Sequence, residues 1–322
     1  MSARSPESPI RVGISSCLLG QEVRWDGGHK RDRYITDTLG RFFTWVPVCP
    51  EFEAGLGVPR ETLRLVGDPD APRLLFRKSG GDQTERLAAW AGSRLKDLGR
   101  EDLCGYILKS DSPSCGMERV KVYRDDGRPG RRQGVGLFAR ALMKKFPLLP
   151  VEEEGRLHDL PIRENFIERV FCSRRWKDLV AGGLTRGRLG TFHSVHKLLL
   201  LAHSPKHYTL LGRLVAHAKE LSPGDLQRRY GAEFMAALRI QATAKKHTNV
   251  LHHILGYLKR HLDRRDKAEA VTIIDEFHRG LVPLVVPLTL LKHHLDRAEV
   301  PYIREQVYLR PHPRELMLRN HV

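Results

Sequence analysis

Three cysteines are the residues of this 322-residue chain whose type and placement best suit chemistry. Cys17, Cys49 and Cys115 each stand just beyond a short apolar run, in the segments ISSCLLG, VPVCPE and KSDSPSCG. Thiolates are the usual ligands of iron-sulfur clusters, and three of them leave one iron open for chemistry. A catalytic zinc is one alternative, but such sites more often recruit histidine, and residues 1–155 contain only His29. Unrelated structural cysteines are another, because free cysteine is often buried.

The apolar runs before the cysteines predict buried strands at 12–16, 43–48 and 106–108. Between the strands, helical spacing at 84–98 indicates an alternating βαβαβ order and therefore a parallel sheet. Ligands bind at the carboxyl ends of parallel strands. We therefore expect a Rossmann-like α/β domain in which the three thiols converge at one sheet edge, although they lie far apart in the sequence.

Four motifs in a fixed order resemble the thiouracil desulfidase family of iron-sulfur enzymes over roughly residues 10 to 150. They are Cys17-Leu-Leu-Gly20, Val23-Arg-Trp-Asp-Gly-Gly28, Val48-Cys-Pro-Glu51 and Lys109-Ser-Asp-Ser-Pro-Ser-Cys-Gly116. The resemblance implies a 4Fe-4S cluster held by Cys17, Cys49 and Cys115, whose fourth iron takes the sulfur of a thiolated pyrimidine. It also implies that Glu51 acts as acid and base, with Ser112 as its helper, while water replaces sulfur by oxygen.

The two catalytic candidates also have ordinary structural interpretations. Glu51 lies two residues from a cysteine, where it is placed to handle a proton of the attacking water. It is equally suited to a salt bridge or a helix cap. Ser112 precedes a proline and is suited to shaping the turn before Cys115.

The length of the chain suggests two domains, and its charge is unevenly divided between them. Lys and Arg exceed Asp and Glu by 4 before residue 156 and by 13 from there onward, which together make the net charge of +17. We predict an iron-sulfur catalytic domain at 1–155 and a separate basic all-α domain at 156–322. Apolar residues at helical spacing predict consecutive helices in the second domain, with an extended connection around Pro283 and Pro287.

A helical domain this basic favours a polyanionic partner, because cationic side chains gain affinity by releasing counterions from phosphates. The candidate RNA contacts are Lys197, Arg213, Lys245, Lys246 and His247. For each of them a solvated helix face is the alternative. His193, His196 and His203 can share one helix face, and we expect core or phosphate-contact histidines rather than a metal site there.

The second half also resembles a known module, through FHSVHKLLLLAHS, KKHTNVLHHILGY, VPLTLLKHH and YLRPHPRELMLRN. Bacterial proteins that fuse this module to a thiouracil desulfidase-like domain are similar to enzymes that remove sulfur from 4-thiouridine in tRNA. The resemblance therefore implies conversion of 4-thiouridine in tRNA to uridine, with release of sulfide and no net redox change. Two alternatives stay open: a desulfidase of free thiolated bases or nucleosides, and a nucleic-acid-binding redox sensor.

Composition argues against several other classes of protein. No signal peptide and no stretch of about 18 apolar residues is evident, so we expect a cytoplasmic protein without membrane contact. Five cysteines do not form a disulfide framework, and the absence of Cys-x-x-Cys disfavours a thiol-redox or zinc protein. No protein partner is predicted.

Overall fold

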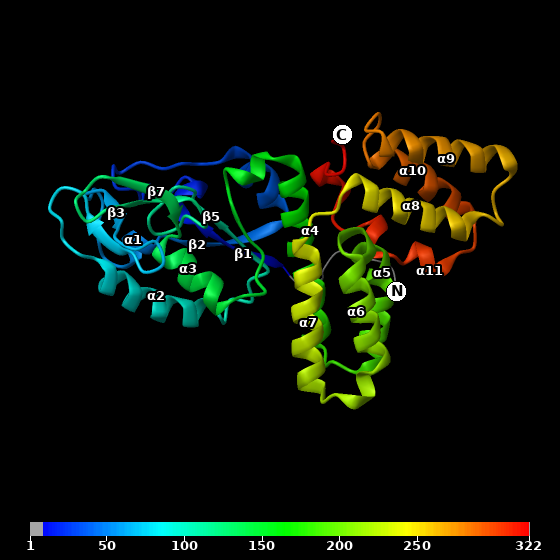
Figure 1. Cartoon of the computed structure of the whole chain (residues 1–322), viewed down its shortest axis with the longest axis horizontal. Helices are drawn as coiled ribbons and strands as arrows, with labels where there is room; N and C mark the ends of the chain where they lie inside the picture. Colours follow the sequence, from blue (N-terminus) through cyan, green and yellow to red (C-terminus); the bar gives the residue numbers. More distant parts are fainter. Residues whose placement is uncertain (1–8, 322) are drawn as a thin grey trace. The chain divides into compact units, whose positions relative to one another are not determined.

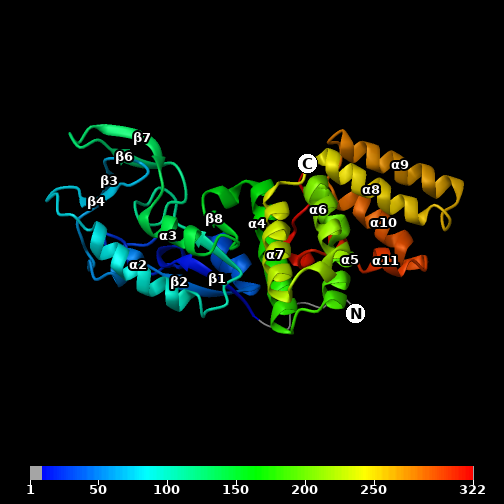
Figure 2. The ribbon, with the colours of Figure 1, turned by 60° about the horizontal axis from the view of Figure 1, so that its bottom comes forward.

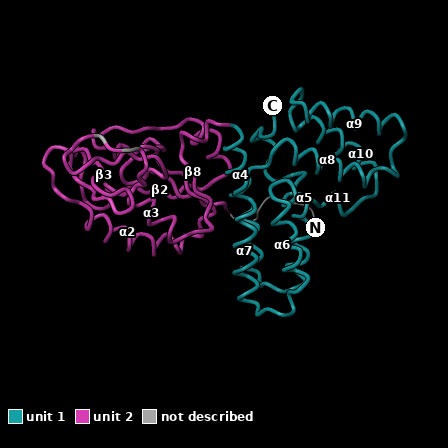
Figure 3. The backbone as a smooth tube through the Cα atoms, in the orientation of Figure 1, with its two compact units in different colours: residues 1–7, 160–322 teal, residues 8–159 magenta. Residues whose placement is uncertain are grey.

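The structure is a computed structural model that describes residues 9–321. The described residues form two compact units, 9–159 and 160–321 (Figure 3). The boundary predicted from charge and composition, after residue 155, lies within the short segment that ends the first unit. No described helix combines the length and the apolar character needed to cross a membrane.

A four-stranded parallel sheet forms the centre of the first unit. Its strand order is β2-β1-β5-β8, with all neighbours parallel. The strands are β1 (Ile10–Ser15), β2 (Phe43–Val48), β5 (Gly105–Leu108) and β8 (Val151–Glu153). β1, β2 and β5 are mostly apolar, whereas β8 at the edge has the sequence Val-Glu-Glu. The predicted parallel α/β arrangement is confirmed.

Two helices cover one face of this sheet, as Figures 1 and 2 show. They are α2 (Thr84–Leu98) and α3 (Leu137–Lys145). α2 buries Leu87, Ala91, Leu95 and Leu98, which are spaced so that they share one side of a helix. At the centre of the sheet, a Cβ on Gly13 would stand 2.2 Å from the ring of Tyr106. Glycine is therefore required where β1 passes this aromatic ring of β5.

A second four-stranded sheet was not predicted from the sequence. Its order is β4-β3-β6-β7, with a parallel pair at the centre and antiparallel pairs outside. The strands are β3 (Leu63–Val66), β4 (Arg73–Phe76), β6 (Val120–Tyr123) and β7 (Pro129–Gly134). Leu65, Leu74, Val120 and Val122 form its core together with Leu87 of α2.

The second unit is helical, as predicted. Its helices are α4 (Leu160–Ala181), α5 (Arg186–His203), α6 (Pro205–Ala216), α7 (Pro223–Arg239), α8 (Ala244–Leu258), α9 (Arg264–His278), α10 (Val285–Arg297) and α11 (Pro301–Arg304). α5, α6, α7, α8 and α9 begin after a residue whose side-chain oxygen accepts a backbone N–H of the first turn, which stabilises a helix start; these are Thr185, Ser204, Ser222, Thr243 and Asp263. Pro287 lies in the first turn of α10, so the predicted extended connection there is wrong.

Candidate active site

Cys17, Cys49 and Cys115 lie at the carboxyl ends of three adjacent parallel strands. Cys17 is in the 3-10 turn that follows β1, and Cys49 stands between β2 and the short helix α1 (Pro50–Glu53). Cys115 is in the loop after β5. All three line one cavity of about 410 Å³. Because β2, β1 and β5 are neighbours in the sheet, the fold brings these distant thiols to one edge.

Cys115 is buried, Cys17 and Cys49 are half-buried, and the three thiols interact electrostatically. Burial and the proximity of Cys49 raise the pKa of Cys17 to about 11, although Lys109 and Arg24 oppose the shift. Burial also raises the pKa of Cys49, against the effect of backbone N–H groups in α1. The pKa of Cys115 is raised well above its ordinary value by burial, while a hydrogen bond from Ser15 favours its thiolate. A positively charged group at this edge is therefore needed before all three thiols can ionise together.

Glu51 faces the same cavity from the first turn of α1 and is held at both carboxylate oxygens. Oε2 forms an ion pair with the guanidinium of Arg60, whose Nε lies 3.1 Å away. The Arg60 side chain is only 4% exposed, and it also donates to the backbone carbonyls of Val23 and Gly57, both at 3.0 Å. The carboxylate of Glu51 is thus oriented by a buried and firmly anchored cation. Arg60 was not predicted from the sequence, because no local pattern links it to Glu51.

A serine hydroxyl contacts the other oxygen of Glu51, and it belongs to Ser114. The Ser114 hydroxyl is fully buried and donates to Oε1 of Glu51 at 2.9 Å. Ser112 lines the cavity, and its hydroxyl accepts the backbone N–H groups of Ser114 at 3.2 Å and Cys115 at 3.1 Å. Ser112 was the serine predicted to assist Glu51, whereas Ser114, in the same motif, was not predicted to do so.

The loop that carries Cys115 is fastened to the start of α3. The N–H groups of Gly136, Leu137 and Ala139 donate to carbonyls of Gly116, Pro113 and Ser114, at 2.8 to 3.1 Å. A Cβ on Gly136 would lie 2.5 Å from the Ser114 carbonyl, so only glycine allows this approach. Gly136 therefore positions the loop that carries Cys115 against the start of α3.

The mouth of the cavity combines an aromatic ring with positive charge. Trp25 lines it and is 45% exposed. Arg24, Lys30 and Lys109 line it as well. Lys109 is held by Glu154 at 2.5 Å and by the hydroxyl of Ser110 at 2.9 Å. A planar, electron-rich ligand has both a stacking surface and cations at this entrance.

The five candidate RNA contacts differ in how much of each side chain is free. Arg213 and Lys245 are exposed, and Lys197 is half-buried. Lys246 is held inside the helical unit by the backbone carbonyls of His203 at 2.7 Å and Gln241 at 3.3 Å.

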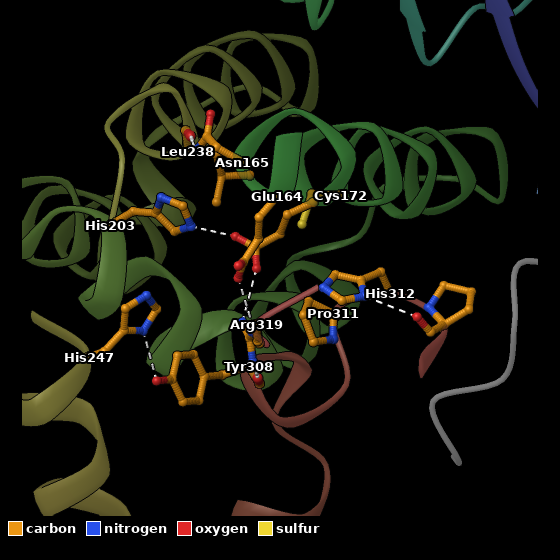
Figure 4. Close-up of polar contacts among 12 residues, drawn as sticks. Glu164, Asn165, Cys172, His203, Leu238, His247, Tyr308, Pro311, His312 and Arg319 are labelled. Atoms are coloured by element: carbon orange, nitrogen blue, oxygen red, sulfur yellow. Dashed lines mark hydrogen bonds and ion pairs between the residues drawn. The ribbon is translucent and has the colours of Figure 1, made fainter. Parts of the chain in front are cut away.

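The imidazole of His247 lies largely inside the helical unit. It hydrogen-bonds the Tyr308 hydroxyl at 2.9 Å (Figure 4). Burial lowers its pKa to about 3. The placements of Lys246 and His247 therefore argue against their predicted contact with RNA, because both side chains are engaged in internal packing.

The three histidines of α5 are core residues, as their helix face suggested. His193 contacts the Tyr230 hydroxyl at 3.1 Å, and His196 stacks on Phe192 with ring centroids 4.0 Å apart. His203 has a carboxylate partner that the sequence did not reveal, since its Nε2 lies 2.5 Å from Glu168 of α4. Cys104 and Cys172 are fully buried, away from the cavity that the other three cysteines line.

Two separate parts of the chain match two different protein families. Residues 12–154 match 2-thiouracil desulfurase, and residues 197–313 match a protein of unknown function, DUF1722. A solved structure described as 4Fe-4S-dependent thiouracil desulfidase TudS is 29% identical, with a TM-score of 0.38, covering 48% of this chain and 97% of that chain.

Two curated relatives are similar over most of their own lengths. Uncharacterized protein YbgA of Escherichia coli strain K12 is 34% identical over 47% of this chain and 90% of its own. Uncharacterized protein YbbK of Bacillus subtilis strain 168 is 32% identical over 32% of this chain and 71% of its own. The chain therefore belongs to the family of YbgA and to that of YbbK, and it joins a 2-thiouracil desulfurase domain to a DUF1722 domain.

Proposed function

We propose that this chain is an iron-sulfur-dependent desulfidase that replaces the sulfur of 4-thiouridine in tRNA by oxygen. The observation that carries the chemistry is the convergence of Cys17, Cys49 and Cys115 on the cavity that also contains Glu51. The match of this domain to 2-thiouracil desulfurase supports the same reaction class. We place the protein in the reducing cytoplasm, where its five cysteines do not form disulfides.

The donor set fits a 4Fe-4S cluster held by the three cysteines. Within residues 9–321, no group of three or more His, Cys, Asp or Glu side chains is close enough together to hold a single metal ion. A cluster differs from a single ion in that each cysteine binds its own iron, so the thiols need only face one cavity. When bound, the cluster would supply a thiophilic iron without a protein ligand, which acts as a Lewis acid toward a thiocarbonyl sulfur.

The protein side chains then account for the protons. Glu51 is placed to take a proton from the water that attacks the pyrimidine carbon, and its ion pair with Arg60 orients the carboxylate. The Ser114 hydroxyl fixes the other oxygen of the carboxylate. One water is consumed, the C–S bond is replaced by a C–O bond, and sulfur leaves as sulfide. No electrons are gained or lost overall.

The charge of the second domain supports a polynucleotide substrate. Its excess of 13 cationic side chains, with Arg213 and Lys245 exposed, provides phosphate contacts. Bringing a thiolated base of a folded tRNA to the cavity requires unstacking it, at a cost of a few kcal/mol. Phosphate contacts offset that cost.

A free thiolated base or nucleoside is the second candidate substrate. The cavity volume of about 410 Å³ is within the range of small-molecule sites, roughly 300 to 1,000 Å³. The exposed ring of Trp25 at its mouth offers a stacking surface to a free pyrimidine as well.

The test uses the full chain purified without oxygen and shown to carry iron. It is incubated separately with tRNA containing 4-thiouridine, with free 4-thiouridine and with 2-thiouracil, and both loss of substrate and release of sulfide are followed. Efficient turnover of the tRNA with equimolar sulfide supports the proposal. Turnover of the free compounds alone rules out tRNA as the substrate, and no sulfide from any of them rules out desulfuration.

A further inference from the structure

A second large cavity lies within the helical unit, between α10 and the C-terminal segment 309–320. Its volume is about 690 Å³. In Figures 1 and 2 these two parts belong to the orange-to-red end of the chain. The backbone joins them where the N–H of Val285 donates to the carbonyl of Arg319 at 3.0 Å. The residues that line it are Val285, Leu288, Thr289, Lys292, His293, Asp296, Leu309, Arg310, Pro311, His312, Arg314, Leu318, Arg319 and Asn320.

Positive charge dominates the wall of this cavity. Lys292 projects from α10 and is half-buried, and Arg310 and Arg314 face the same space from the C-terminal segment. Within residues 9–321, these three side chains have no hydrogen bond or ion pair. Of the described lining residues, Asp296 is the acidic one. The cavity therefore gathers three cations that form no ion pair with any residue from 9 to 321, and it has a single acidic lining residue among them.

Arg319 lines the same cavity, but unlike the other three cations it forms ion pairs. Its guanidinium is buried and contacts Glu164 and Glu168, each at 3.1 Å (Figure 4). It also donates to the carbonyl of Tyr308 at 2.7 Å. These two carboxylates neutralise Arg319 and anchor the C-terminal segment to α4, so its role is structural. The free cations beside it have no such arrangement.

The electrostatic cost of this arrangement is visible at Lys292. Burial, followed by the nearby Arg319, Arg310 and Arg314, lowers its pKa to about 8, while Asp296 opposes the shift. Like charges that converge in a partly desolvated space repel one another, and a bound anion relieves that repulsion. The helical unit thus keeps unfavourable charges together at a concave surface.

We propose that the cavity formed by Lys292, Arg310 and Arg314 binds a phosphate group. Guanidinium groups match phosphate oxygens with paired N–H donors, and a lysine adds a compact charge. A volume of about 690 Å³ exceeds that of a bare phosphate, so the phosphate belongs to a larger ligand, either a mononucleotide or an RNA chain. The proposal does not depend on desulfuration, because it concerns residues of the second unit alone.

Calorimetric titration of the full, iron-loaded chain with inorganic phosphate tests the site, with chloride used to keep the ionic strength constant. Lys292→Met and Arg314→Gln should each weaken phosphate binding by about tenfold or more, because each removes a charge-assisted contact. Arg297→Gln is the matched control: Arg297 is exposed on the same helix, does not line the cavity and should leave binding unchanged. Arg314 is exposed, so its substitution does not endanger folding.

Equal binding by wild type, Lys292→Met and Arg314→Gln would overturn the proposal, as would an equal loss in Arg297→Gln. Uridine 5′-monophosphate and a short oligouridine without sulfur then identify the source of the phosphate. Displacement of inorganic phosphate by oligouridine, lost in Arg314→Gln, assigns the site to an RNA chain. Displacement by the mononucleotide alone assigns it to a small phosphorylated ligand.

Discussion

The hydroxyl of Ser114 donates a 2.9 Å hydrogen bond to Oε1 of Glu51, across 63 residues of sequence. The other carboxylate oxygen is bound by Arg60, so Glu51 has a fixed orientation beside the cavity that the cysteines line. Glu51 follows β2, Ser114 follows β5 and Arg60 precedes β3, so three separate segments together hold this carboxylate. Because Ser114 contacts Glu51 and Ser112 does not, substitution of each serine can distinguish a catalytic role from a structural one.

Ser114→Ala should slow sulfide release by roughly tenfold to a hundredfold, because Glu51 loses the partner that orients it. Ser112→Ala should instead lower the melting temperature, because two backbone N–H groups of the loop lose their acceptor. Single-turnover sulfide release and thermal unfolding of both variants distinguish the roles. A large loss of sulfide release in Ser112→Ala, without one in Ser114→Ala, would show that Ser112 is the serine that assists Glu51.

Glu51→Gln should keep the iron content and reduce turnover by about a hundredfold or more, because an amide accepts no proton from water. Arg60→Lys preserves a positive charge but not the paired donors, so it should give an intermediate rate. Iron analysis together with steady-state sulfide release measures both effects. Full activity of Glu51→Gln contradicts the acid-base role.

Cys17→Ala, Cys49→Ala and Cys115→Ala should each lose most of the iron and all detectable turnover. Cys104→Ala is the matched control, since Cys104 is fully buried in the same unit but does not line the cavity. Iron content and visible absorbance after anaerobic purification are the measurements. Retention of a full complement of iron in any of the first three variants excludes that cysteine as a ligand.

The helical unit should become less stable as the pH falls below about 6.5. Burial lowers the pKa of His196 and of His247 to about 3, so the unfolded chain binds protons that the folded chain does not. Stability therefore falls with pH from the ordinary histidine value down to the folded value, by about 2 kcal/mol per buried histidine between pH 6.5 and 5.

Hydrogen exchange of α5 at several pH values measures this loss. His196→Gln should flatten the pH dependence, because glutamine does not titrate. His217→Gln should not, because His217 is exposed and its ring lies beside Glu220 at the surface. A pH dependence that is the same in all three proteins shows that burial of His196 is not its cause.

Lys245→Met should reduce the salt dependence of tRNA binding by about one unit in the logarithmic slope if its exposed ammonium contacts a phosphate. Lys246→Met should leave that slope unchanged and lower stability, because its ammonium is bonded to the carbonyls of His203 and Gln241. Binding isotherms at several salt concentrations make the comparison. Identical slopes for wild type and Lys245→Met remove Lys245 from the interface.

Local pattern was sufficient for the elements that place the cysteines. The runs that end at Ser15, Val48 and Leu108 are mostly apolar and rich in buried positions, and this signal does not depend on the rest of the chain. The second sheet escaped prediction because β7 has the sequence PGRRQG, which carries no alternating apolar pattern. Pro287 was predicted to lie in an extended connection but lies in the first turn of α10. Proline is tolerated there because the first turn of a helix needs no backbone N–H donor.

The sequence by itself determined that three thiols stand at strand ends, that a basic helical domain follows, and that one motif carries Glu51 and another the serines. Only the tertiary structure decided that Ser114 and Arg60 hold Glu51, that Glu168 is the partner of His203, and that Lys292 meets Arg310 and Arg314 in one cavity. Periodicity reports which side of an element is buried. The partner of a polar side chain depends instead on how distant loops and helices pack together, which local sequence does not predict.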